Sequence, residues 1–401
     1  MARGANANLL LTRRLHCRRD RPPVSGGRPP ERLMATLTSP ARPHDTALEA
    51  VREKVLAGRR LGFEDGVALY KTHDLLGLGQ LANHVREERH GDAAYFVWNT
   101  HINHTNVCVA TCDFCAFAAK KDEPRAYTMA LDDIFKNVSA LSPFVREVHI
   151  VGGLHPDLPF SYFTDMMRGI KAARPDIHIK AFTAVEMFFF HKLYRMSVEQ
   201  VLRKLKDAGL DSMPGGGAEI FAKETRDKII KGKADAAQWL DVMRKAHELG
   251  IPTNATMLYG HIESVEDRVD HLLRLRELQD ETGGFMTFIP LAFQPWEAPA
   301  MTLPETTGFD DLKAIAVARL MLDNMPHIKS YWIMITPRLA QLGLSFGADD
   351  IDGTVTEEKI AHDAGAGTPQ AMTVQELVRL VREAGRRPVE RDTVFNVVKE
   401  W

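Results

Sequence analysis

The sequence predicts an α/β fold, a complete or partial (β/α)8 barrel of the TIM type, with helices before it and a helical addition after it. From about residue 94, apolar runs alternate with amphipathic helices, and loops that contain Gly or Pro separate them. Strands that alternate with helices in this way pair in parallel. Six such units are distinct and two more are weaker, which favours a barrel over a smaller sheet.

The chain divides into four regions. Residues 1–44 form a basic tail, residues 45–93 a helical segment, residues 94–350 the barrel, and residues 351–401 an addition packed on the barrel. We expect the tail to be disordered, or Met34 to be the true start, because its arginines and prolines lack an apolar pattern. Its apolar stretch at residues 9–11 is too short for a signal peptide or a membrane span.

The predicted elements follow in chain order. Helical spacing marks residues 48–55, and residues 62–90 have the pattern of further short helices. Apolar runs predict strands at 95–102, 147–151, 177–183, 210–213, 253–258, 285–291, 327–335 and, weakly, 344–348. Apolar stripes predict helices at 131–141 and 163–170. Capping-box spacings predict further helix starts at Ser197, Asp235 and Thr373.

Composition excludes several classes of protein. The chain has 401 residues, is 45% hydrophobic and carries a formal net charge of -2, so nothing points to nucleic acid or to an anionic membrane. Four cysteines, three of them clustered, argue against a disulfide framework and favour a reducing compartment. We therefore expect a cytoplasmic protein, in which Cys17 of the tail has no role.

The clustered cysteines form a C-x3-C-x2-C triplet, with the aromatic Phe114 just before the last of them. They are Cys108, Cys112 and Cys115. Three thiolates can hold a 4Fe-4S cluster and leave one iron open to another molecule. One alternative is a structural zinc ion with His101 or His104 as the fourth ligand. Another is a disulfide with one free thiol.

This spacing resembles the signature of the radical S-adenosylmethionine (SAM) superfamily. The resemblance implies one 4Fe-4S cluster on the three cysteines, whose open iron chelates the amino and carboxylate groups of SAM. In such barrels the functional groups lie on the loops that follow the strands. The residues expected to contact SAM are Phe114, Gly152, Gly153, Glu186 and Gly260. The residues expected to contact the substrate are Gly215, Gly216, Gly217, His261 and Arg338.

Several of these residues have a structural alternative. Gly152 and Gly153 would also suit a tight turn, and Leu154 follows where the superfamily usually has Glu, so only a backbone role transfers. Glu186 is either an ordinary solvated carboxylate or an acceptor for the ribose hydroxyls of SAM. The glycine run 215–217 would let a ligand lie against the backbone. It lacks the downstream Gly-Lys-Ser/Thr of a phosphate loop.

Longer segments resemble one family within the superfamily. Residues 211–221, 250–263 and 282–293 are similar to those of the aminofutalosine synthases, which belong to the futalosine route to menaquinone. The likeness runs from about residue 45 to the C-terminus. Cyclic dehypoxanthinyl futalosine synthases and deazaflavin-forming enzymes share the cysteine triplet and the glycine run. The sequence around Met213 and Phe221, and residues 253–259, favour the aminofutalosine synthases.

The resemblance also implies a reaction. The enzyme is a transferase in which a reduced cluster splits SAM, and the 5′-deoxyadenosyl radical adds to 3-[(1-carboxyvinyl)oxy]benzoate. Rearrangement and loss of a carboxyl carbon then give 6-amino-6-deoxyfutalosine. A flavodoxin- or ferredoxin-type protein would supply the electron. The substrate carries two carboxylates, which need cationic or backbone N–H donors, and Arg338 is a candidate donor or an ordinary surface residue.

Overall fold

The computed structural model describes residues 45–401, so the basic tail and Cys17 lie outside the described part of the chain. The described unit begins with α1 (Thr46–Leu56), α2 (Phe63–Lys71) and α3 (Leu75–His90). Asp45 and Asp74 start α1 and α3 by accepting hydrogen bonds from backbone N–H groups in the first turn. α2 packs on α10 (Val265–Thr282), and α3 packs on α11 (Gly308–Met321).

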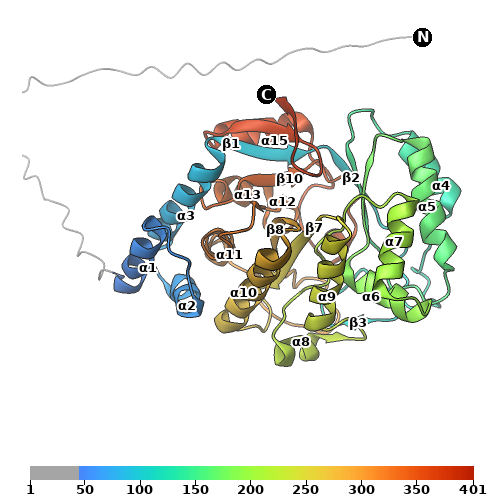
Figure 1. The fold of residues 1–401 in the computed structure, drawn as a ribbon, viewed down its shortest axis with the longest axis horizontal. Helices are drawn as coiled ribbons and strands as arrows, with labels where there is room; N and C mark the ends of the chain where they lie inside the picture. Colours follow the sequence, from blue (N-terminus) through green and yellow to red (C-terminus); the bar gives the residue numbers. More distant parts are fainter. Residues whose placement is uncertain (1–44) are drawn as a thin grey trace, which may run out of the picture. The chain divides into compact units, whose positions relative to one another are not determined.

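Parallel strands form the centre of this unit, and helices surround them (Figure 1). The strands are β1 (Ala93–Val97), β2 (Asn99–Ile102), β4 (Glu147–Ile150), β5 (His178–Ala181), β7 (Thr253–Tyr259), β8 (Phe285–Ala292), β9 (His327–Ile328) and β10 (Asp350–Gly353). The longer helices between them are α4 (Leu131–Ser139), α5 (Phe160–Ala173), α6 (Ala184–Leu193), α7 (Val198–Ala208), α9 (Ala236–Glu248), α10 and α11. The shorter ones are α8 (Lys223–Ile229), α12 (Trp332–Ile335), α13 (Pro337–Gly343) and α14 (Ile360–Asp363).

The strand neighbours make a complete circuit. β2, β4 and β5 pair in parallel, as do β7, β8 and β9. Residues 212–213 bridge β5 on one side and β7 on the other. Lys329, just after β9, bridges Asp350 of β10, and Thr356, just after β10, bridges Thr100 of β2. The predicted barrel is therefore confirmed, with several of its links made by single bridges.

The predicted strands at 327–335 and 344–348 are corrected by the structure. β9 covers only His327–Ile328, and the apolar run after it forms the short helix α12. A short apolar run does not distinguish a strand from a buried helix. Residues 344–348 form turns after α13, and the strand is β10 instead. Two aspartates lie in that strand, so it has no apolar pattern to detect.

The C-terminal segment contains more than the predicted helix. α15 (Val374–Glu383) begins at Thr373 as its capping box predicts. After it, β11 (Arg387–Arg391) pairs in parallel with β1, and β12 (Val397–Glu400) pairs antiparallel with β11. The segment thus adds two strands to the sheet that contains β1. β10 spans Asp350–Gly353, so this strand runs across the predicted boundary between the barrel and the C-terminal addition at residue 350.

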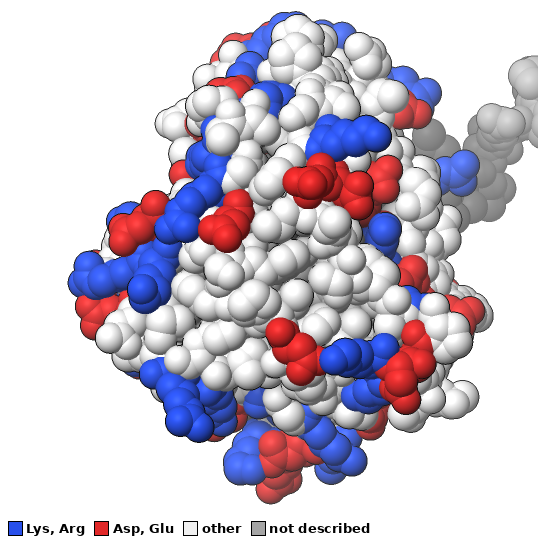
Figure 2. Space-filling model, turned by 90° about the vertical axis from the view of Figure 1, so that its right-hand side faces the viewer, with Lys and Arg blue, Asp and Glu red and all other residues white. Residues whose placement is uncertain are grey.

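A small two-stranded sheet lies apart from the barrel strands. Its strands are β3 (Thr111–Cys112) and β6 (Ile230–Lys231), which pair antiparallel. On the face drawn in Figure 2, Lys and Arg side chains alternate with Asp and Glu, and neither sign covers a broad region. Among the described helices, none is long and apolar enough to cross a membrane.

Candidate functional site

A cavity of about 310 Å³ lies where the loops follow the barrel strands. Most of the residues that the sequence singled out line it, namely Cys108, Cys112, Phe114, Cys115, Gly152, Gly153, Glu186, Gly215, Gly216 and Gly217. They come from the loops after β2, β4 and β5 and from the loop after the 212–213 strand position. Loops after parallel strands meet at one end of a barrel, which explains why residues so distant in sequence share one cavity.

The cysteine loop is held by backbone hydrogen bonds. The N–H of Cys108 donates to the carbonyl of Ala119 at 3.0 Å, and the N–H of Cys115 donates to the carbonyl of Cys112 at 3.1 Å. All three cysteines are free thiols, so the disulfide alternative is not what the structure contains. Burial raises the pKa of Cys112 to about 11 and also raises that of Cys115. Binding of a metal group as thiolates must therefore release protons.

The spacing of the sulfur atoms bears on what these cysteines can hold. Four ligands around one zinc ion at about 2.3 Å would lie roughly 4 Å apart. Within residues 45–401, one group of three potential metal ligands has ligand atoms that all lie within 4.8 Å of one another. This group consists of His90, His327 and Asp349, and it contains no cysteine. The sulfurs of Cys108, Cys112 and Cys115 therefore do not all lie within 4.8 Å of one another, as the ligands of one zinc ion would.

Of the two histidines that could supply a fourth zinc ligand, only His101 lines the cavity. His104 is fully buried beside Phe163 and Phe182, and it does not line the cavity. His101 does line the cavity, but its ring packs against that of His149 with centroids 4.5 Å apart.

Gly152 and Gly153 allow a close packing of two loops. A Cβ on Gly152 would clash with the ring of His104, and one on Gly153 would clash with the carbonyl of Val107. The N–H of Gly153 donates to the carbonyl of Thr105 at 2.8 Å. The two glycines therefore fasten the loop after β4 to the segment that leads into the cysteines.

Glu186 is buried, not solvated. It occupies the third position of α6, where its carboxylate accepts from the N–H of Thr183 at 2.7 Å and from the hydroxyl of Thr183 at 2.9 Å. It also accepts from the N–H of Gly152 at 3.2 Å. Burial nevertheless raises its pKa to about 7. The residue that caps α6 is thus also a titratable group in the cavity wall.

The three glycines of the run have different surroundings. A Cβ on Gly215 would lie 2.7 Å from backbone atoms of β7, and one on Gly217 would clash with Val185 at a positive φ of 81°. A Cβ on Gly216 would meet only the methyl of Thr183, at 3.1 Å. Gly215 and Gly217 are therefore required for packing, whereas Gly216 has a nearly open face.

Gly260, His261 and Arg338 lie outside the cavity lining. Gly260 and His261 form the turn after β7, where both N–H groups donate to Glu263, at 2.6 and 2.8 Å. Arg338 is exposed on α13. Its predicted place is just after a strand, but the helix α12 occupies that segment, and Met334 of α12 lines the cavity whereas Arg338 does not.

Sequence reasoning missed a set of buried charges inside the barrel. Lys180 of β5 pairs with Glu147 of β4 at 2.5 Å, and Lys329 pairs with Asp352 of β10 at 2.9 Å. Both lysines and Asp352 line the cavity. Each lysine lies within a predicted strand, at 177–183 and at 327–335. A charged residue in such a strand is the sequence feature that could have indicated a functional role.

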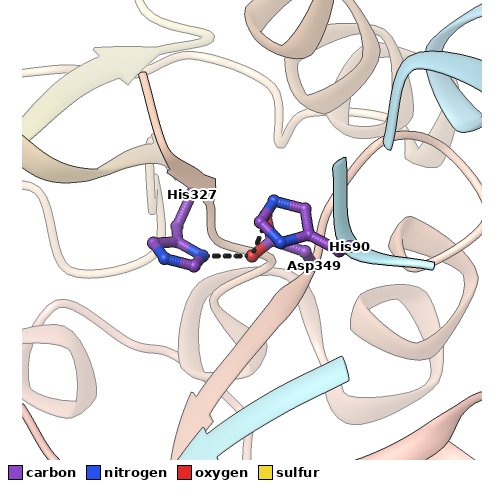
Figure 3. A group of neighbouring side chains, drawn as sticks. All are labelled: His90, His327 and Asp349. Atoms are coloured by element: carbon purple, nitrogen blue, oxygen red, sulfur yellow. Dashed lines mark hydrogen bonds and ion pairs between the residues drawn. The ribbon is translucent and has the colours of Figure 1, made fainter. Parts of the chain in front are cut away.

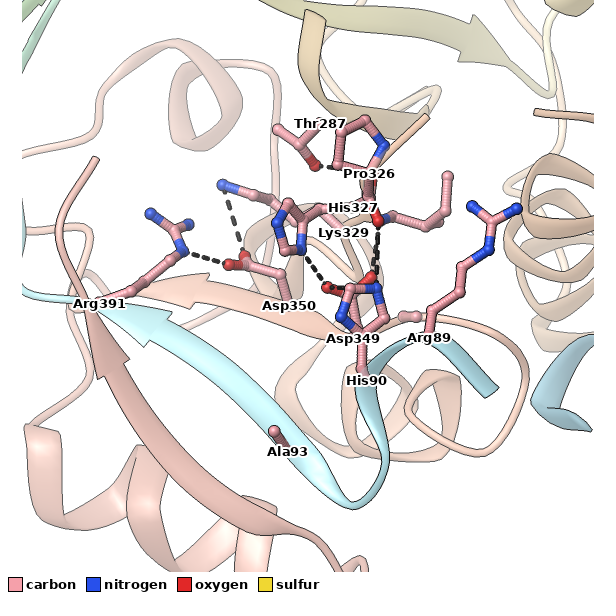
Figure 4. Close-up of polar contacts among 12 residues, drawn as sticks. Arg89, His90, Ala93, Thr287, Pro326, His327, Lys329, Asp349, Asp350 and Arg391 are labelled. Carbon is pink, nitrogen blue, oxygen red and sulfur yellow. Dashed lines mark hydrogen bonds and ion pairs between the residues drawn. The ribbon is translucent and has the colours of Figure 1, made fainter. Parts of the chain in front are cut away.

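A second polar cluster lies at the opposite end of the barrel, where β9 begins and just before β10. Figure 3 shows His327 and His90 on either side of Asp349, with His327 Nδ1 2.5 Å from the carboxylate. Asp349 is also paired with the buried guanidinium of Arg319. In Figure 4 the neighbouring Asp350 lies between Lys329 and Arg391. Because Arg319 already neutralises Asp349, we interpret this cluster as a structural ion-pair network.

Known proteins share both the sequence and the fold. The radical SAM superfamily matches residues 102–275, and the CofH/MqnC C-terminal region matches residues 282–400. Aminodeoxyfutalosine synthase of Thermus thermophilus is 51% identical over 89% of this chain and 97% of its own length. That of Streptomyces coelicolor is 47% identical over 88% and 94%. Cyclic dehypoxanthine futalosine synthase of Halalkalibacterium halodurans is 36% identical over 88% and 96%, so this alternative has less support.

Among solved structures, methylornithine synthase (PylB) has a TM-score of 0.68 at 18% identity, over 84% of this chain and 97% of that one, which shows the fold. Together with the 51% and 47% identities, these matches show that the chain belongs to the aminodeoxyfutalosine synthase family of radical SAM enzymes.

Proposed function

We propose that this enzyme joins the 5′-deoxyadenosyl group of SAM to the enol-ether double bond of 3-[(1-carboxyvinyl)oxy]benzoate. Rearrangement and loss of one carboxyl carbon would give 6-amino-6-deoxyfutalosine. The observation that carries the proposal is that the cysteine loop, Glu186 and the glycine run face one cavity. The family relationship supports the same reaction.

Cys108, Cys112 and Cys115 would hold one 4Fe-4S cluster as thiolates, and all three line the cavity. When bound and reduced, the cluster supplies the single electron that splits the C5′–S bond of SAM. The cavity wall beside the cysteines contains apolar side chains, among them Phe117, Leu154 and Val185. Such a wall limits the access of water to a reactive carbon centre.

Glu186 and the loop after β4 would bind SAM. The Glu186 carboxylate is an acceptor suited to the two hydroxyls of a ribose, and it lies in the same wall as Gly152 and Gly153. Phe114, next to Cys115, also lines the cavity. Its ring would bound the site on the cysteine side.

Lys180 and Lys329 would provide the charged donors for the substrate carboxylates. Both reach the cavity from barrel strands and are almost fully buried, with side-chain exposures of 5% and 2%. A charge-assisted hydrogen bond inside such a cavity is stronger than one in water. Arg338 is exposed and outside the lining, so these lysines replace it in the proposal. Gly216, with its open face, would let the substrate approach the backbone.

The electron would come from a flavodoxin- or ferredoxin-type protein. Val109, next to the first cysteine, is 48% exposed, so the cysteine loop reaches the surface where such a partner can dock. Free thiols at all three positions fit a reducing compartment, and we place the enzyme in the cytoplasm.

An anaerobic assay with the reconstituted enzyme tests the proposed reaction. With SAM labelled at C5′ and 3-[(1-carboxyvinyl)oxy]benzoate present, the label should appear in a product that contains both the adenosine and the benzoate parts. Recovery of the label only in free 5′-deoxyadenosine would reject the addition and move the assignment to a hydrogen-abstracting relative. Cys115→Ala protein, treated in the same way, provides the background without a complete cluster.

A further inference from the structure

We propose that Lys233 is an electrostatic positioning residue, whose ammonium group faces the cluster-binding cysteines and raises the reduction potential of the cluster. This inference rests on the proposed function, because it assumes that the cysteines hold a 4Fe-4S cluster. Lys233 lines the same cavity as all three cysteines. Its side chain is only 15% exposed. No sequence pattern singles out Lys233, because it lies in a lysine-rich stretch after α8.

The position of Lys233 is set by the backbone around it. β6 pairs with β3, so that Cys112 lies opposite Ile230. The N–H of Asp113 also donates to the carbonyl of Ile229 at 3.0 Å. The segment that carries Lys233 is therefore fastened directly to the cysteine loop.

Arg226 fastens the same segment to the glycine run. Its buried guanidinium donates to the carbonyl of Ala218 at 2.5 Å and to that of Gly217 at 3.1 Å. It also donates to the carbonyl of Ala234, the residue after Lys233, at 2.6 Å. The glycine run, Lys233 and the cysteine loop thus form one connected unit.

The ammonium group has one carboxylate partner in this unit. Lys233 Nζ lies 3.0 Å from Glu219 Oε1, and the Glu219 side chain is 10% exposed. Glu219 has a positive φ of 47°, a strained conformation for a residue other than glycine. Lys233 Nζ also lies 5.5 Å from the centre of the ring of Phe114, the residue before Cys115.

The charges predict the direction of the effect. One-electron reduction adds a negative charge to a cluster that already carries three thiolates. A cation in a poorly solvated wall stabilises the more negative, reduced form, and a carboxylate destabilises it. Lys233→Gln should therefore lower the potential, because it removes the cation and leaves Glu219 unpaired. Glu219→Gln should raise it, because the cation is no longer neutralised.

A redox titration of the anaerobically reconstituted enzyme, followed by the electron paramagnetic resonance signal of the reduced cluster, tests these signs. Iron and sulfide content are measured for every variant. Lys233→Arg keeps the charge and should titrate close to the wild type. The double variant Lys233→Gln/Glu219→Gln should lie between the two single variants. Lys231→Gln, an exposed lysine on β6, is the matched control and should not shift.

Opposite shifts for Lys233→Gln and Glu219→Gln support the proposal, since a merely structural role does not produce opposite signs. Shifts of the same sign, or no shift in fully loaded protein, would overturn it. If Lys233→Gln fails to load a cluster, Glu219→Gln still decides by whether its potential rises. The titration needs no substrate, so an error in the proposed reaction would leave this result unaffected. An error in the cluster assignment would appear as absence of the signal in the wild type.

Discussion

Binding of SAM should weaken as the pH falls below about 7, because Glu186 must be ionised to accept hydrogen bonds from ribose hydroxyls. Burial raises the pKa of Glu186 from 4.5 to about 7 in the ligand-free protein. If only the carboxylate form binds SAM, the dissociation constant increases by the ratio of total to ionised Glu186. That factor is about 1.1 at pH 8 and about 11 at pH 6, a difference of about 1.4 kcal/mol.

The stability of the ligand-free protein should respond to pH in the opposite direction. Glu186 has a pKa raised by folding, so it contributes stability that is present below pH 4.5 and is lost as the pH rises through about 7. The separation between these two values corresponds to about 3 kcal/mol as an upper limit. Higher pH thus favours SAM binding while it destabilises the empty fold.

Calorimetric titration of cluster-loaded protein with SAM at pH 6, 7 and 8 measures the binding effect. Glu186→Gln is the matched variant, because it keeps the shape and an acceptor oxygen but does not titrate. At pH 8 the variant should bind SAM about tenfold to a hundredfold more weakly than the wild type. This factor corresponds to the loss of a hydrogen bond to a charged group, about 1.5–3 kcal/mol. Titration of groups on SAM itself changes the affinity of the wild type and of Glu186→Gln equally, so the difference between the two proteins reports Glu186 alone. Parallel curves for the two proteins would show that Glu186 does not bind the cofactor as a carboxylate.

The remaining predictions concern the cluster, the product and the fold. Replacement by Ala of any one of Cys108, Cys112 and Cys115 should abolish the 4Fe-4S absorbance and turnover, and Cys17→Ala should do neither. Gly216→Ala should fold, because its Cβ meets only one methyl at 3.1 Å, and should raise the share of labelled free 5′-deoxyadenosine by misplacing the substrate. An unchanged product ratio would exclude Gly216 from the substrate site. Asp349→Asn should cost about 3–5 kcal/mol in urea unfolding, since it leaves the buried Arg319 unpaired. Arg319 and His327 hold the pKa of Asp349 well below 3.8, so the stability it contributes is lost as the pH falls. A cost below about 1 kcal/mol would contradict the network.

The fold could be predicted as far as apolar periodicity reveals it. β8 is a largely apolar run, and the helices after Ser197, Asp235 and Thr373 begin as their capping boxes predict. β10 could not be found in this way, because its aspartates are neutralised by cations from distant parts of the chain. β11 and β12 add to β1 from the far end of the sequence, a pairing that no local pattern encodes.

The rule that site residues follow strands predicts the cavity lining only in part, since Gly260 and His261 directly follow β7 but lie outside it. The cysteines, Glu186 and the glycine run satisfy that rule and meet in one cavity. Lys233 does not follow a barrel strand. It lies near the cysteine loop because β6, which precedes it, pairs with β3, and this contact between distant segments is not visible in the sequence. Arg338 shows the converse error. Its place was inferred from a strand at 327–335, and the chain turns into α12 before reaching it.

Asp349 and two polar atoms of the cavity wall differ in whether the described residues supply their hydrogen-bond partners. At the end where β9 begins, Asp349 has Arg319 and His327 as partners within the chain. At the cavity end, His101 Nε2 and Asn254 Oδ1 are buried without a hydrogen-bond partner from the described residues. An unpaired buried polar atom costs about 1–3 kcal/mol, so a ligand that supplies its partner would stabilise the protein by up to that amount. The substrate and SAM would therefore complete the polar interior of the barrel, and their binding should stabilise the fold as well as position the reaction.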